Sequence, residues 1–269
     1  MSFSSSTPIH QPSPTLRGTR NMPANSSERQ RRRAKDVTIR SIVTIPNSPT
    51  CRIIGCGNPT RAAASAGLNR LYCRRHEDHF QRHGSYVRGS LSFTEVAPLR
   101  ATALAWIERS RDLPRVALAL RAITTVLGNA GAPIEAFRLR GLSPSERARA
   151  SLARVRVAGT QPEAIFAACL AVELATFHDT KAARATEYKE VQVAKLIHRM
   201  ASGTHRRWER ERPNGTVEVT EMHRYPASRG RVLRHLGQAI RQAAELVVEH
   251  HLDDLLAFKT ARDEARAMN

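Results

Sequence analysis

Four side chains that bind soft metal ions lie in two close pairs in the first third of the chain. They read Cys51-x4-Cys56-x16-Cys73-x2-His76 within the stretch CRIIGCGNPTRAAASAGLNRLYCRRH. Cysteine thiolates and histidine imidazoles bind zinc tetrahedrally, and two ligand pairs with a hairpin-sized insert between them are typical of structural zinc sites. The spacing therefore predicts one structural Zn²⁺ as cofactor. Its ligands would be Cys51, Cys56, Cys73 and His76.

The residues around these ligands predict a small module that folds around the metal. Glycines flank the second cysteine, where the chain must turn tightly, and Cys73 and His76 can share one face in the first turn of a helix over residues 73–83. Gly84 is suited to the C-cap of that helix. A segment of about 40 residues buries too small an apolar core, whereas zinc contributes about 10–16 kcal/mol of apparent binding energy to such modules. Metal should therefore decide whether this segment folds.

Other interpretations of the cysteines and histidines stay open at this level. His79 could replace His76 as the fourth ligand, because the spacing allows either, and the cysteines could be unrelated to one another. A disulfide is disfavoured, because the chain shows no secretory signal and cytosolic thiols are kept reduced. His79 and His83 could hold a second, open metal site of a nuclease. That chemistry needs a histidine between Cys56 and Cys73 to activate water, and there is none.

The motifs CGNP, YCRRH and FQRHG resemble the treble-clef zinc modules of bacterial and phage DNA-associated proteins. The resemblance covers residues 48–90. It implies a zinc knuckle, a hairpin and a helix that carries the second ligand pair, with the same four ligands. The four residues between Cys51 and Cys56 exceed the usual two of such knuckles.

The charge of the chain indicates an anionic partner. Lys and Arg number 43 against 24 Asp and Glu, for a formal net charge of +19. Nucleic acid, an acidic protein and an anionic membrane surface would all fit. Nearly all of the positive charge is arginine, which suits contacts to phosphates and guanine edges, although a codon-biased genome would give the same composition.

Two groups of arginines are candidates for contact with nucleic acid. The first surrounds the predicted finger, with Tyr72, Phe80 and Tyr86 interleaved, and consists of Arg70, Arg74, Arg75, Arg82 and Arg88. Positive charge beside exposed aromatics favours phosphate contact and base stacking. The alternative is that the aromatics form the miniature core of the finger and the arginines are merely solvated. The second group lies on a predicted β-hairpin and consists of Arg206, Arg207 and Arg210.

The fold class that we predict is mainly α: a small treble-clef zinc finger followed by a helical domain with one β-hairpin. Residues 1–45 should be a disordered basic arm, residues 46–90 the zinc finger, and residues 91–269 the helical domain. Ser143 and Glu146 form a capping box around Pro144 and predict a helix over 144–157. Apolar stripes of helical period predict further helices. These begin near Pro114, Pro162, Tyr188 and Gly230.

The hairpin is predicted over residues 204–225, with Asn214 and Gly215 as a two-residue turn. This turn would place Arg206 opposite His223 and Trp208 opposite Glu221. Predicted helices over 144–157, 161–178 and 186–201 precede it, an order compatible with a winged helix whose third helix enters the major groove. The alternative is that Trp208 and Val219 pack the hairpin onto the helices.

We therefore expect a cytoplasmic, nucleic-acid-binding protein, with DNA as the partner, in a regulatory role or accessory to a mobile element. No window has the length and apolar character of a signal peptide or a spanning helix. No catalytic triad or phosphate-binding glycine loop stands out, so an enzyme is not expected. The main alternative is a protein-interaction adaptor that self-associates through the long helix over about 230–260.

Overall fold

The computed structural model describes residues 49–179, 185–201, 206–222 and 230–268, together with residues 31, 34 and 35. Within these ranges the side chains of residues 137, 206–208 and 220–222 are left out of the description. Apart from residues 31, 34 and 35, the predicted basic arm over residues 1–45 lies outside the described residues.

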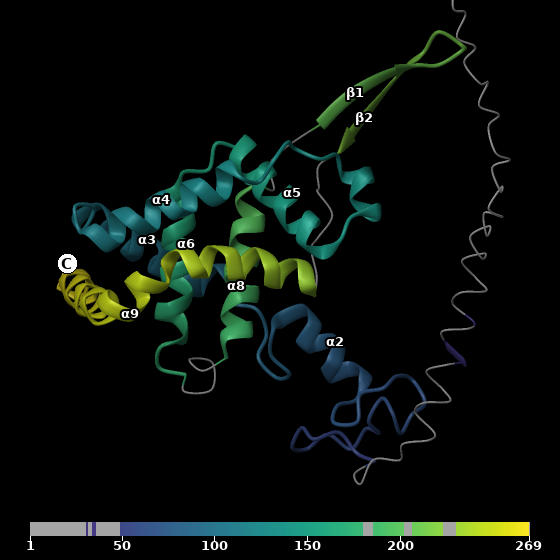
Figure 1. The fold of residues 1–269 in the computed structure, drawn as a ribbon, viewed down its shortest axis with the longest axis horizontal. Helices are drawn as coiled ribbons and strands as arrows, with labels where there is room; N and C mark the ends of the chain where they lie inside the picture. Colours follow the sequence, from purple (N-terminus) through teal and green to yellow (C-terminus); the bar gives the residue numbers. More distant parts are fainter. Residues whose placement is uncertain are drawn as a thin grey trace, which may run out of the picture.

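The architecture is mainly helical with one antiparallel hairpin, as predicted (Figure 1). The helices are α2 (Arg74–His83), α3 (Phe93–Arg109), α4 (Pro114–Gly128), α5 (Pro144–Val157), α6 (Pro162–Thr176), α8 (Thr186–Met200) and α9 (Arg231–Ala267), with a 3₁₀ helix, η1 (Ala136–Gly141). The strands are β1 (Arg206–Glu211) and β2 (Val217–Met222). Figure 1 shows α3 to α9 gathered into one body, with α2 and the cysteine-rich segment at one side and the hairpin projecting away from it.

The core of the helical body is built around α6. This helix packs against α3, α4, α8 and α9, and its Ile165, Phe166 and Leu170 are at most 1% exposed. Alanines between these large residues allow neighbouring helices to approach closely. Cys169 also lies in this core, and burial raises the pKa of its thiol to about 12.

Local sequence signals set the helix boundaries. The capping box at Ser143 and Glu146 is present, with Pro144 in the first turn. One helix was not assigned from sequence, α3, although Ser92 and Glu95 form a second capping box at its start. Pro98 lies inside α3, which obscures the pattern because proline normally interrupts a helix.

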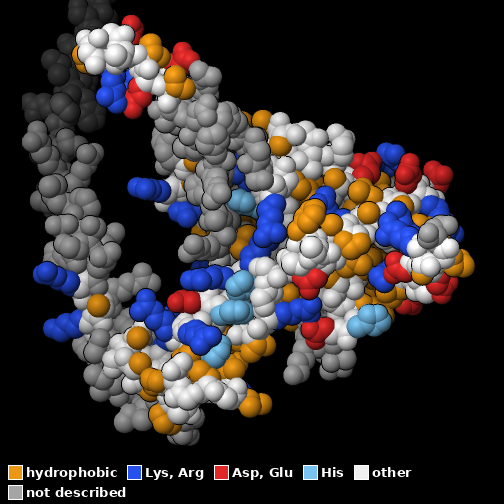
Figure 2. Space-filling view, turned by 180° about the vertical axis from the view of Figure 1, so that it is seen from behind, with side chains coloured by type: hydrophobic (Ala, Val, Ile, Leu, Met, Phe, Trp, Pro, Cys, Tyr) orange, Lys and Arg blue, Asp and Glu red, His pale blue; other side chains and the backbone are white. Residues whose placement is uncertain are grey.

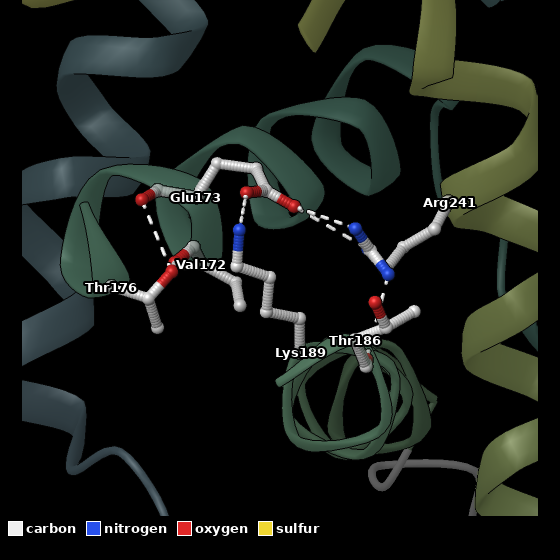
Figure 3. Close-up of polar contacts among 6 residues, drawn as sticks. All are labelled: Val172, Glu173, Thr176, Thr186, Lys189 and Arg241. Atoms are coloured by element: carbon white, nitrogen blue, oxygen red, sulfur yellow. Dashed lines mark hydrogen bonds and ion pairs between the residues drawn. The ribbon is translucent and has the colours of Figure 1, made fainter. Parts of the chain in front are cut away.

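A buried ionic network joins three helices (Figure 3). The Glu173 carboxylate on α6 is 1% exposed. It accepts hydrogen bonds from the Lys189 ammonium on α8 and, at 3.2–3.3 Å, from the Arg241 guanidinium on α9. Because a buried charge without a partner is costly, the three side chains fix how α6, α8 and α9 meet.

The hairpin differs from the prediction in its turn. The Arg212 N–H donates to the Thr216 carbonyl and the Gly215 N–H to the Arg212 carbonyl, both at 2.9 Å. The loop therefore holds Pro213, Asn214 and Gly215, with Gly215 at φ +79°. A three-residue loop of this kind is a type I turn followed by a left-handed residue, and proline suits its first position.

The longer loop shifts the register by one residue, so the predicted pairing was wrong. Arg206 lies opposite Met222 rather than His223, and Trp208 lies opposite Thr220 rather than Glu221. Val217 and Val219 are 56% and 44% exposed. Val219 therefore does not pack the hairpin onto the helices.

The third helix before the hairpin is central in the body, which argues against the winged-helix interpretation. Of the 15 residues of α8, only Thr186 and Arg199 are largely exposed. The helix packs against α2, α5, α6 and α9. A recognition helix must present a face to the major groove, whereas only two residues of α8 are largely exposed in the described structure.

The apolar face of the long helix α9 is covered by other helices of the same chain. Its apolar residues Leu236, Ile240 and Val247 are at most 1% exposed, and the helix packs against α3, α4, α5, α6 and α8. Gly237 allows the close crossing with α8, because a Cβ atom there would lie 2.0 Å from the Glu190 carbonyl oxygen. Among the described residues, no helix combines the length and apolar character needed to cross a membrane.

Candidate metal centre and basic surface

The structure brings the four predicted ligands together. One candidate ligand atom from each of Cys51, Cys56, Cys73 and His76 lies within 4.8 Å of the other three. His76 Nδ1 is 3.3 Å from Cys51 Sγ and 3.4 Å from Cys73 Sγ, and Cys56 Sγ is 3.9 Å from Cys73 Sγ. All three cysteines are free thiols. These side chains could hold one metal ion.

The first ligand pair lies on a tight knuckle. The Cys56 N–H donates to the Ile53 carbonyl at 2.9 Å, and Gly55 between them adopts φ +79°. The Cys51 N–H donates to the Asn58 carbonyl at 2.9 Å. A positive φ is costly for residues with a Cβ atom, so the glycine permits this turn.

The second ligand pair begins α2. Cys73 is the N-cap, His76 follows within the first turn, and Gly84 ends the helix with φ 73°, as predicted. Asn69 stabilises the turn that leads into α2, because its Oδ1 accepts hydrogen bonds from the N–H groups of Leu71 and Tyr72, each at 2.9 Å. Between the knuckle and α2 the chain forms turns, where the treble-clef resemblance implies a hairpin.

The environment of Cys51 favours the metal-binding form of its thiol. Burial opposes ionisation, but hydrogen bonds at the backbone of Ile53 and Cys73 and at the His76 side chain outweigh it. Together they lower the pKa of Cys51 to about 7. Since the thiolate is the ligand, this site is prepared for a cation.

His79 and His83 take other roles. His79 Nδ1 lies 2.8 Å from the Ser85 carbonyl oxygen, to which it donates, and His83 Nδ1 lies 3.0 Å from Ser90 Oγ. The two rings are 4.3 Å apart, centroid to centroid. In the described residues the cluster contains His76 and not His79, so His79 does not replace it.

The aromatic residues of the module stack on one another. Tyr86 lies between Tyr72 and Phe80, with ring centroids at 3.6 Å and 4.4 Å. Each of the three side chains is partly exposed. Their faces are thus largely covered by each other, which favours the interpretation as a miniature core over that of a platform for bases.

Four of the five arginines predicted around the finger lie on its surface. Figure 2 shows Lys, Arg and His side chains gathered where this module meets the helical body. The exposed arginines are Arg70, Arg74, Arg75 and Arg82. Arg74 lies 3.9 Å from Asp78, whereas Arg75 and Arg82 form no ion pair with a described residue. Seven residues apart on α2, Arg75 and Arg82 share one face.

The other predicted arginines are placed differently. Arg88 forms a 2.5 Å ion pair with Asp179 and lies over the Tyr188 ring, so it connects the module to the helical body. On the hairpin, Arg210 is exposed and directly opposite Glu218. The side chains of Arg206 and Arg207 lie outside the described residues. The described part of the hairpin surface carries mixed charge.

Several residues at the junction of module and body were missed from sequence. Gln192 Nε2 on α8 donates to the His83 carbonyl at 3.0 Å, and its Oε1 accepts the Leu91 N–H at 3.1 Å. Arg234 on α9 pairs with Glu187 and lies over the Phe80 ring. These partners are far apart along the chain, so no local pattern could have found them.

The arrangement is that of a closed metal centre beside a basic surface. If all four side chains bound one ion, they would complete a tetrahedron and leave no position for a reacting water. The arginine-bearing helix begins at one of these candidate ligands, Cys73. Comparisons with protein families, curated proteins and solved structures gave no match for this chain.

Proposed function

We propose that this protein binds nucleic acid, with DNA as the partner, and that a structural zinc ion organises the binding surface. Its role would be regulatory or accessory to a mobile element. The observation that carries the proposal is the exposed positive charge of Arg75 and Arg82 on α2, the helix that starts at the candidate metal centre; no described carboxylate pairs with either arginine. The net charge of +19 supports an anionic partner.

The donor set supports zinc as the metal. In a tetrahedron with Zn–S bonds of about 2.3 Å and Zn–N bonds of about 2.0 Å, sulfur atoms lie about 3.8 Å apart, and sulfur and nitrogen about 3.5 Å apart. The 3.9 Å separation of Cys56 and Cys73 Sγ, and the 3.3–3.4 Å from His76 Nδ1 to two sulfurs, are compatible with these edges. Three thiolates and one imidazole form a common structural zinc site.

The charge on α2 is tested by a salt series of binding to duplex DNA. Each phosphate contact contributes about −0.9 to the slope of log K against log salt concentration. We expect the double variant Arg75→Ala, Arg82→Ala to bind more weakly and to reduce the slope by about two. The matched control is Arg115→Ala, Arg121→Ala, which removes two exposed arginines from α4. An equal loss in both variants would assign binding to net charge and contradict a surface on α2.

The adaptor alternative draws on a different observation. Ile54, Leu68 and Leu71 are largely exposed on the module, a surface that could bind a protein. Self-association through α9 loses support, because the apolar stripe of that helix is buried within the chain. Salt-insensitive association with a protein, without DNA binding, would favour the adaptor.

A further inference from the structure

A second polar cluster, distinct from the metal centre, lies where the end of α2, the connection over 84–91 and α8 meet. The Lys195 ammonium donates to Ser90 Oγ at 2.5 Å and lies 3.4 Å from His83 Nδ1. Ser90 Oγ and His83 Nδ1 are 3.0 Å apart. Lys195, Ser90 and His83, here called the Lys195 cluster, thus form a closed triangle from three separate segments. All three are partly exposed.

The Lys195 cluster carries positive charge that no described carboxylate pairs with. Burial, together with the charges of Lys195, His79 and Arg82, lowers the pKa of His83 to about 4. Burial and Arg199 lower the pKa of Lys195 to about 8. The groups that shift these pKa values are all basic. A partly buried ammonium among other cations is unfavourable by itself, and an anion would relieve that cost.

The hydrogen-bond directions leave donors for such an anion. An ammonium can only donate, so His83 Nδ1 accepts from Lys195, and the neutral ring then carries its hydrogen on Nε2. Two of the three Lys195 N–H groups are directed to Ser90 and His83. The third N–H can therefore donate to an external oxygen without breaking the triangle, whereas the His83 Nε2–H lies on the far side of the ring and could donate only to a separate acceptor.

The backbone around the cluster is held in place by α8. The side chain of Gln192 donates a hydrogen bond to the His83 carbonyl at 3.0 Å and accepts one from the Leu91 N–H at 3.1 Å. The Tyr188 hydroxyl donates to the Gly89 carbonyl at 3.0 Å. Ser90 therefore lies between two residues, Gly89 and Leu91, whose backbone groups are held by hydrogen bonds to α8. Donors that are already in position bind an anion with little ordering cost.

We propose that Lys195, His83 and Ser90 form a binding site for a phosphate group. Phosphate offers several strong acceptor oxygens and negative charge, which match the Lys195 ammonium, a cation with a spare N–H and no described carboxylate partner. Arg82 and Arg199 add positive charge nearby. The inference goes beyond the proposed function, because a free phosphate would fit the site as well as one from a DNA backbone.

Competitive labelling of lysines tests the site without relying on DNA binding. The chain has only five lysines, so mass spectrometry can follow acetylation of each one. Inorganic phosphate at about ten times its Kd should slow acetylation of Lys195 about tenfold, relative to sodium chloride at the same ionic strength. Lys259, which pairs with Asp263 on α9, is the internal control and should not change.

A serine variant and duplex DNA complete the test. Ser90→Ala should weaken phosphate protection of Lys195 about tenfold, because it removes the oxygen that accepts from the ammonium and holds it in position, and hydrogen bonds to charged groups are strong. Ser85→Ala, in the same connection but outside the cluster, should not. Protection by both inorganic phosphate and DNA would assign the site to the nucleic-acid backbone; protection by inorganic phosphate alone would assign it to a free phosphate. No phosphate-specific protection, or equal protection in Ser90→Ala, overturns the proposal, whatever the Arg75 and Arg82 variants show of DNA binding.

Discussion

The metal-binding module and the helical body of this protein are stabilised by different means. In the module over residues 49–90, the buried apolar or sulfur-bearing side chains are Cys51, Ala62 and Cys73, and α2 has no buried residue. The helical body buries large side chains such as Trp106 and Phe166. Burial of apolar area is the main favourable term in folding. The described part of the module therefore lacks a sizeable apolar core of its own, and a metal ion at its four candidate ligands would supply the missing stability, whereas the body can fold by burial alone.

The largest expected effect comes from breaking the metal centre. Cys73→Ser should abolish metal binding, which is worth about 10–16 kcal/mol in comparable modules. Hydrogen exchange of the amides over residues 51–76 should then accelerate strongly, while amides of α6 stay protected. Cys169→Ser, the same change in the helical core, should keep the metal. Protection of the module without metal would show that the two regions do not differ in this way.

The reverse test removes core volume from the body. Phe166→Ala should lower the free energy of unfolding by about 3–5 kcal/mol, because it leaves a cavity in a fully buried site. Chemical denaturation measures the loss. Metal content should stay near that of the wild type. If the metal is lost to the same degree, the module and the body unfold as one unit.

A smaller effect is expected from the crossing of α8 and α9. Gly237→Ala places a Cβ atom 2.0 Å from the Glu190 carbonyl oxygen, so the helices must move apart. We expect a loss of about 1–3 kcal/mol in the free energy of unfolding. Gly128→Ala is the control, because its Cβ would meet no atom within 4 Å. Similar denaturation midpoints for the two variants would contradict close packing at this crossing.

The smallest effect concerns pH and the junction. The pKa of Lys195 is about 8 in the folded chain, below its ordinary value of 10.5. Between these values the unfolded chain binds a proton that the folded chain does not, so this group makes stability rise with pH across that window. Below the window both states hold the proton, and the destabilising effect of the partly buried ammonium is constant. Lys195→Met should flatten the rise, as measured by denaturation at about pH 8, 9 and 10. Lys259→Met should leave it unchanged; a rise that persists in Lys195→Met would assign it to other groups.

Features that depend on neighbouring residues were predicted well from sequence. The extent of α2, with Cys73 at its start and Gly84 at its end, follows from cap preferences and ligand spacing. The capping box at Ser143 and the grouping of the ligands were also confirmed. The hairpin was found but its register was not, because Pro213 joined the loop and one extra loop residue shifts every pair.

The sequence by itself determined which residues could bind a metal ion, where most helices begin and how much net positive charge the chain carries, because these properties depend on residue type and short spacing. Only the tertiary structure decided that Arg88 turns to Asp179, that α8 is buried, and that Lys195 meets Ser90. Lys195 and Ser90 are 105 positions apart. Contacts at such separations depend on the path of the whole chain and on which helices pack together, and no local pattern of residues carries that information.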